Sequence, residues 1–260
     1  MNISPSVKVS RVFFAVAIIA LGVQHFIFKD FITGRPPKWP EWLPGQFVIA
    51  YLSGIILIAA GLAILTNKRV KLVLLITGSM ILLWAGMRNL TGLITTLDYG
   101  ILLTTTNKAL TLGFGAFLVA ATFGNENKTE TVVDKWTDRL APVSRYTIGF
   151  FLFASGVQHF LFADFVKFLI PAWIPGATFW VYFSGVALIA GGLGILTNIK
   201  GKFAAALSGW MIFIWLFVLH IPRAVTATTG AGNEWIGVFE ALAVSGLLFI
   251  LSERNGKLNT

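Results

Sequence analysis

Long runs of apolar residues, separated by short polar segments, divide this chain into eight blocks. Each block approaches the roughly 20 residues that an α-helix needs to cross a hydrocarbon core about 30 Å thick. The runs are continuous rather than strictly alternating, which favours helices over the strands of a membrane barrel. The predicted spans are Arg11 to Phe28, Gln46 to Thr66, Lys71 to Asn89, Asn107 to Gly124, Val143 to Phe162, Thr178 to Thr197, Phe203 to His220 and Glu234 to Ser252.

The composition also indicates an integral membrane protein. Of the 260 residues, 56% are hydrophobic and 12% are charged, whereas a soluble domain carries about a quarter of charged residues. The chain has no cysteine, which excludes disulfides, thiolate metal sites and dithiol exchange. Any redox chemistry would therefore need a bound cofactor.

The basic residues predict how the chain lies in the membrane. The formal net charge of +9 is typical of cytoplasmic loops that face anionic lipid, so membrane lipid is the expected partner and nucleic acid is not. If the N-terminus is cytoplasmic, 13 of the 20 Lys and Arg residues lie on that side and 7 on the other. This bias predicts that both termini are cytoplasmic.

The second half of the sequence repeats the first. The stretch "GVQHFIFKDF", Gly22 to Phe31, returns as "GVQHFLFADF", Gly156 to Phe165, 134 residues later. An offset of 131 residues then pairs Trp42 with Trp173, Gly54 with Gly185, Met80 with Met211 and Trp84 with Trp215. The repeat contains four predicted helices, and an even number lets both halves enter the membrane from the same side. We therefore expect parallel repeats related by an axis near the membrane normal.

These observations predict an all-α integral membrane protein whose eight transmembrane helices form two parallel-repeat four-helix bundles. Residues 1–124 form the first repeat, residues 125–142 a cytoplasmic linker and residues 143–260 the second repeat. The linker is the longest polar stretch and predicts a short amphipathic helix around Val132 to Leu140, which lies on the surface or docks on the bundle. No chemistry is assigned to the linker.

Two histidines end equivalent helices at the predicted outer membrane face. His25 follows Gln24, and His159 follows Gln158. In one interpretation each histidine interacts with the free carbonyls and the negative dipole at the end of its helix. In the other, the His and Gln side chains bind a cofactor, either a haem through axial ligands or a quinone through hydrogen bonds. Haem is disfavoured because the first half offers no further histidine.

Tryptophan and proline combine in the loops "KWPEWLPG" and "IPAWIPG" that follow these histidines. Such loops are typical of interfacial anchors at the membrane surface, where proline also stiffens the chain. The alternative is an aromatic lid over a lipid-soluble ligand, which makes Trp173 a candidate cofactor-binding residue.

The second half holds a richer set of polar residues near its last two spans. His220 and Arg223 lie three residues apart, and Glu240 lies inside the last span. An ionisable residue within a membrane helix is costly and is by default a functional hypothesis once a partner is named. The predicted partner of Glu240 is Arg223 or His220, and these three are the candidate catalytic residues. The alternative is a buried ion pair that fixes helix register.

The equivalent positions in the first half have diverged, because Lys108 corresponds to Glu240 and Asn89 to His220. If only one half is active, the second is favoured. No metal-ligand spacing, phosphate-binding loop or nucleophile elbow appears, so no metal site is predicted and the hydrolase and nucleotide classes have no support.

The motifs "GVQHFLFADF", "PAWIPG", "YFSGVALIAGGLGILT" and "HIPR" followed by "NEWIGVFEAL" resemble the DoxX family of four-helix bacterial membrane proteins. Each half resembles one such unit, although the first half reads "RNLTG" in place of the His-x-Pro-Arg element. The resemblance implies an inner-membrane location. The family includes, more distantly, the DoxD-type subunit of thiosulfate:quinone oxidoreductase, which implies a quinone cofactor and a soluble redox partner. The resemblance implies functional roles for four residues: His159, His220, Arg223 and Glu240.

Three functions follow as hypotheses. The first is a quinone-interacting or redox-associated membrane subunit, with His159, His220, Arg223 and Glu240 in one outward-facing pocket under the Trp173 loop. The second is a structural or assembly membrane protein without catalytic activity. The third is a carrier of a small solute or lipid, because parallel duplication is one way to build a path.

Overall fold

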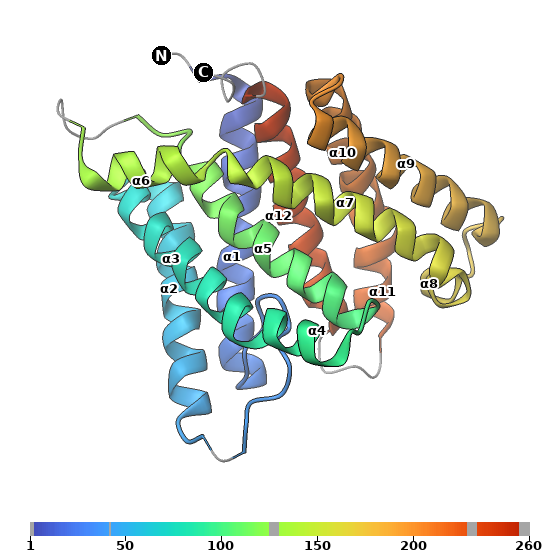
Figure 1. Ribbon diagram of the computed structural model, residues 1–260, viewed down its shortest axis with the longest axis horizontal. Helices are drawn as coiled ribbons and strands as arrows, with labels where there is room; N and C mark the ends of the chain where they lie inside the picture. The colour runs from blue at the N-terminus through green and yellow to red at the C-terminus, as the bar shows by residue number, and fades with distance from the viewer. Residues whose placement is uncertain (1–2, 42, 125–129, 228–232, 255–260) are drawn as a thin grey trace.

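The computed structural model describes residues 3–41, 43–124, 130–227 and 233–254, and over these ranges the regular secondary structure is helical (Figure 1). Eight helices within them are long and apolar enough to cross a membrane, as the sequence predicts. The elements are α1 (Pro5–Phe28), α2 (Gln46–Thr66), α3 (Val70–Trp84), η1 (Ala85–Leu90), α4 (Thr91–Thr96), α5 (Ile101–Ala120), α6 (Val132–Leu140), α7 (Val143–Leu161), α8 (Ala163–Leu169), α9 (Ala177–Thr197), α10 (Gly201–Trp215), η2 (Leu216–His220), α11 (Ile221–Thr226) and α12 (Asn233–Arg254). Trp42, the predicted counterpart of Trp173, and linker residues 125–129 lie outside the described residues.

The fourth span begins earlier than predicted, at Ile101 rather than Asn107. The intervening segment is rich in threonine and reads as a polar loop, but its hydroxyl groups are satisfied within the helix. Thr104 and Thr106 each donate to the carbonyl oxygen four residues earlier, at 2.9 and 2.6 Å. A polar side chain bonded in this way can stay in a helix without water. α1 likewise begins earlier than predicted, at Pro5.

The third and seventh spans each contain a π-helical segment that the sequence did not predict. α3 continues through η1 into α4, and α10 continues through η2 into α11, so both spans run beyond their predicted ends. Pro222 follows η2 as the second residue of α11, inside this continuous span, where it removes one backbone N–H donor from the helix. η1 and η2 begin at Ala85 and Leu216, two positions that the offset of 131 residues pairs. Such wide turns are rare and are frequent at functional sites.

The two halves of the chain are interleaved. α1 packs along α2 and also along α12 of the other half, whereas α7 packs along α9 and along α5 of the other half. α5 and α12 also contact each other and are the most buried of the eight spans. The last helix of each half lies between the halves, so the two predicted four-helix repeats pack closely against each other. α1 begins and α12 ends at the same end of the molecule (Figure 1).

Paired glycines set the crossing of the first two helices in each half. A Cβ atom on Gly22 would lie 2.8 Å from the backbone oxygen of Gly54, and one on Gly156 would lie 2.7 Å from that of Gly185. Small residues at such crossings allow two backbones to approach, which is a common means of helix association in membranes. The same contact thus occurs at positions that the sequence repeat pairs.

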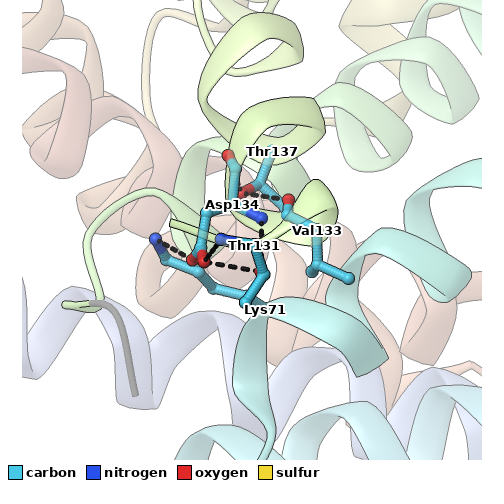
Figure 2. Close-up of polar contacts among 5 residues, drawn as sticks. All are labelled: Lys71, Thr131, Val133, Asp134 and Thr137. Carbon is cyan, nitrogen blue, oxygen red and sulfur yellow. Dashed lines mark hydrogen bonds and ion pairs between the residues drawn. The ribbon is translucent and has the colours of Figure 1, made fainter. Parts of the chain in front are cut away.

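The predicted amphipathic helix forms over the predicted residues as α6 and docks on the first half (Figure 2). Its Asp134 is buried and lies 2.9 Å from the Nζ atom of Lys71 in the first turn of α3. The Thr131 amide donates to the Asp134 carboxylate at 2.8 Å, and the Asp134 amide donates to the Thr131 hydroxyl at 3.2 Å, which forms a capping box. Of the two predicted arrangements, the structure adopts the docked one.

Candidate functional site

A cluster of charged residues lies where the two halves meet, around Glu240 of α12. The Glu240 side chain is 3% exposed, and its Oε2 atom lies 2.7 Å from the Nζ atom of Lys108 on α5. A guanidinium nitrogen of Arg35, in the loop after α1, lies 3.8 Å from the same oxygen. A carboxylate this deeply buried requires cationic partners, because its desolvation is expensive. Both cations come from the first half of the chain.

The second oxygen of Glu240 has a different environment. Oε1 is buried and has no hydrogen-bond partner among the residues that the structure describes. A buried polar atom without a partner is uncommon in native proteins and costs about 1–3 kcal/mol. Glu240 therefore has one oxygen held by cations and one that can still accept a hydrogen bond or a proton.

His220 approaches this carboxylate from η2. A Cβ atom on Gly237 of α12 would lie 3.5 Å from the His220 Nδ1 atom, so the end of η2 lies against the first turns of α12. The ring is within electrostatic reach of Glu240, Lys108 and two arginines, Arg35 and Arg223. The widened turn of η2 ends at this residue. The cluster thus combines a buried carboxylate, an imidazole and three cationic side chains.

Of the two predicted partners of Glu240, His220 lies near it, whereas Arg223 makes no described salt bridge to it. Arg223 donates instead to the backbone oxygen of Leu169, at 2.8 Å, and so fixes the end of α8. The direct partner is Lys108, which the sequence predicts only as the counterpart of Glu240 in the repeat. The alignment of the two halves pairs Lys108 with Glu240, and this pairing could have suggested a contact between them. The contact requires α5 and α12 to lie side by side, which a hydropathy pattern does not indicate.

The first half carries an equivalent loop anchor that sequence reasoning missed. Arg88 of η1 donates to the Pro37 backbone oxygen, and its guanidinium lies over the rings of Phe31 and Trp39, 4.9 and 5.2 Å from their centroids. Asn89, the counterpart of His220, donates to the Gly34 oxygen at 2.7 Å. These contacts hold the loop after α1 against the bundle and so place Arg35 beside Glu240.

Gly34 permits this close approach of the loop. Its φ is +70°, and a Cβ atom would lie 2.4 Å from the Cβ atom of Ala109 on α5. Any other residue would be strained in this conformation and would clash with α5, next to Lys108.

His25 behaves as a structural anchor. Its Nδ1 atom lies 2.8 Å from the Leu21 oxygen, and its Nε2 atom accepts a hydrogen bond from the Ile32 amide at 3.2 Å. Both ring nitrogens are therefore used, and the residue is 1% exposed. Neither nitrogen remains to bind a cofactor, so the ligand interpretation of His25 is wrong in this structure.

The two glutamines of the repeated motif differ in their hydrogen bonds. Gln158 donates to the Tyr99 and Gly100 oxygens at 2.7 and 3.0 Å and accepts from the Thr104 hydroxyl at 2.8 Å, so it holds the start of α5 against α7. Gln24 is buried. By the repeat, the counterparts of Tyr99 and Gly100 fall at about 230–232, outside the described residues.

His159 and Trp173 do not join the charged cluster as predicted. The His159 Nδ1 atom lies 2.7 Å from the Ser155 oxygen, and no described contact links the ring to Glu240 or His220. Trp173 is 62% exposed, and no described contact joins it to the cluster. The predicted single pocket is therefore divided: Glu240, His220 and Arg223 gather with residues of the first half, and His159 lies apart.

Comparison with known families adds little about chemistry. The sequence model of a family described as a domain of unknown function (DUF8561) matches residues 148–248, which is less than half of the chain. This segment contains His159, Trp173, His220, Arg223 and Glu240. No curated protein and no solved structure matches the chain. Within the described residues, no group of three or more His, Asp or Glu side chains could hold a metal ion.

Proposed function

We propose that this chain is an integral protein of the bacterial inner membrane, built from two DoxX-like parallel repeats with both termini in the cytoplasm. Large apolar side chains remain exposed around the helices, such as Ile94 at 65% and Phe168 at 83%. Soluble proteins rarely leave so much apolar surface in contact with water, whereas lipid would cover it. The common end of α1 and α12 fits an even number of crossings (Figure 1).

Three further observations support the duplicated architecture. The paired helices cross at paired glycines, the paired π-helical segments begin at paired positions, and both paired histidines bond a carbonyl one turn earlier. These features depend on backbone geometry as well as on residue identity. An origin from one four-helix unit accounts for all three.

We further propose that the charged cluster is the functional site of a quinone-interacting, redox-associated membrane protein. The observation that carries this proposal is the buried Oε1 atom of Glu240, which has no partner among the described residues and lies in a cluster with His220. Reduction of a quinone to a quinol takes up two electrons and two protons. The electrons would come from a soluble redox partner, and Glu240 and His220 would pass protons to the quinone oxygens. Lys108 and Arg35 would hold the other carboxylate oxygen in place.

The test is to measure quinone that copurifies with the protein. Organic extracts of detergent-purified wild type, Glu240→Gln and His220→Ala would be analysed by mass spectrometry after thermal unfolding has established that each protein is folded at the temperature of purification. Glu130→Gln is the matched control, because that carboxylate is 55% exposed and its nearest cation is 3.9 Å away. We expect quinone in the wild type and the control and a several-fold loss in the two cluster variants. Background quinone in the wild type would overturn the proposal, and equal quinone in all four proteins would remove the cluster from it.

A structural or assembly role is the second candidate, and one observation favours it. The Lys108–Glu240 pair connects α5 to α12 across the two halves, which is a sufficient reason to retain both charges. In that case Glu240→Gln lowers stability, but a cell that makes normal amounts of the variant behaves like the wild type. An altered phenotype at normal abundance would argue against this role.

A further inference from the structure

The His159 ring has an unused hydrogen-bond acceptor. Its Nδ1 atom lies 2.7 Å from a carbonyl oxygen, that of Ser155, so Nδ1 carries the proton. In the neutral ring, Nε2 then carries a lone pair and accepts a hydrogen bond. No group among the described residues donates to Nε2, and the ring is only partly buried.

Its counterpart His25 indicates what fits beside such a ring. The Ile32 amide donates to the His25 Nε2 atom at 3.2 Å, and the Phe31 ring lies edge-on at 6.4 Å between centroids. Phe31 in turn stacks on Trp39, with 5.4 Å between centroids and 7° between planes. The first half therefore fills this position with an N–H donor and an aromatic ring from its own loop.

The second half does not supply these groups. Phe165, the counterpart of Phe31, is 61% exposed, whereas Phe31 is 7% exposed. The chain after His159 coils into α8 instead of folding back as the loop does after His25. Trp215, the counterpart of Trp84, packs edge-on against Trp180, at 5.6 Å, rather than against a loop phenylalanine.

The surroundings of His159 face the lipid phase of the proposed membrane. The next two residues, Phe160 and Leu161, are 42% and 66% exposed. On the inner side α7 is closed against α9, because a Cβ atom on Gly185 would lie 3.0 Å from the Cβ atom of His159. A molecule beside the partly buried His159 ring would therefore also meet exposed apolar side chains.

We propose that His159 binds a lipid-soluble molecule whose planar ring carries a hydroxyl donor, that is, a quinol or a phenol. The hydroxyl donates to Nε2 as the Ile32 amide does to His25, and the ring takes the place that Phe31 takes in the first half. The position is separate from the charged cluster. The assignment of a quinol rests on the proposed quinone interaction, and it makes His159 the residue that distinguishes the reduced from the oxidised ring.

The experiment measures binding of a decyl-chain hydroquinone and of its dimethyl ether to the full-length protein in lipid nanodiscs under argon. The ether has the same ring and tail but no hydroxyl donor. His159→Asn keeps a donor for the Ser155 oxygen and removes the acceptor at Nε2, whereas His159→Gln places an amide oxygen near Nε2 and loses the local bond. Glu240→Gln tests the cluster in the same assay, and circular dichroism establishes that each variant is folded.

The expected result is that the wild type binds the hydroquinone about tenfold more tightly than the ether, the preference that one hydrogen bond supplies. This preference disappears in His159→Asn, survives in part in His159→Gln and persists in the exposed control Glu130→Gln. Equal preference in His159→Asn and the wild type would overturn this inference, and loss of binding in Glu240→Gln alone would then leave the proposed function standing. No binding of either compound to the wild type would overturn both.

Discussion

Neutralising Lys108 and Glu240, singly and together, tests whether the two halves are joined by charge. Lys108→Gln leaves Glu240, which is 3% exposed, with Arg35 as its nearest cation at 3.8 Å. Glu240→Gln leaves Lys108, whose side chain is 22% exposed and can turn toward solvent or lipid headgroups. The two single variants are therefore not equivalent.

The magnitudes follow from this difference in burial. Removing one partner of a buried ion pair costs about 3–5 kcal/mol when the remaining charge stays buried. We expect Lys108→Gln to approach the lower end of that range, about 3 kcal/mol, because Arg35 still offsets part of the charge. Glu240→Gln should cost about 1–2 kcal/mol, because the remaining ammonium can be solvated. The double variant leaves no buried carboxylate and should cost less than Lys108→Gln alone.

The assay is reversible unfolding in mixed micelles, followed by circular dichroism, with the four proteins compared as a double-mutant cycle. Independent sites give additive losses within about 0.5 kcal/mol. Additive losses here would refute the reasoning, and so would a larger loss in Glu240→Gln than in Lys108→Gln. Either result would mean that the carboxylate reaches water or that another cation replaces Lys108.

Two further predictions concern packing and the docked linker helix. Gly156→Ala should lower the free energy of unfolding by about 1–3 kcal/mol, because its Cβ atom would lie 2.7 Å from a backbone oxygen of α9. Gly86→Ala is the control, because a Cβ atom there would have nothing within 4 Å. Its free energy of unfolding should stay within about 1 kcal/mol of the wild type. Lys71→Ala should release α6 from the bundle, because Asp134 would otherwise stay buried without its cation. Limited proteolysis should then cleave residues 130–140 several-fold faster. Lys135→Ala changes a 65% exposed side chain and should leave the cleavage rate unchanged.

The sequence predicted most of the helical architecture because the apolar runs report burial or lipid contact directly. The eight spans and the extent of α6 follow from this pattern. The start of α5 does not, because threonine hydroxyls bonded to their own helix make a polar segment compatible with a span. The π-helical segments at Ala85 and Leu216 do not follow from it either, because the apolar pattern of a span does not distinguish a π-helical turn from an α-helical one.

The candidate site was predicted less completely, and the reason is topological. Glu240 and His220 were identified from the cost of charge within an apolar span, and the structure brings them together. Lys108 and Arg35 were missed as their partners because each belongs to the other half. A repeat invites the assumption that each copy completes its own site, whereas α5 and α12 lie between the copies.

The histidine of the repeated Gln-His-Phe sequence therefore has different hydrogen-bond partners in the two halves. In the first half, the Ile32 amide donates to the His25 Nε2 atom, and Asn89 fixes the loop after α1 by donating to the Gly34 oxygen. That fixed loop is what places Arg35 at the carboxylate of Glu240. The second half keeps the acceptor of His159 open and has an imidazole, that of His220, where Asn89 stands. The first half thus supplies support and positive charge, and the proposed chemistry belongs to the second half.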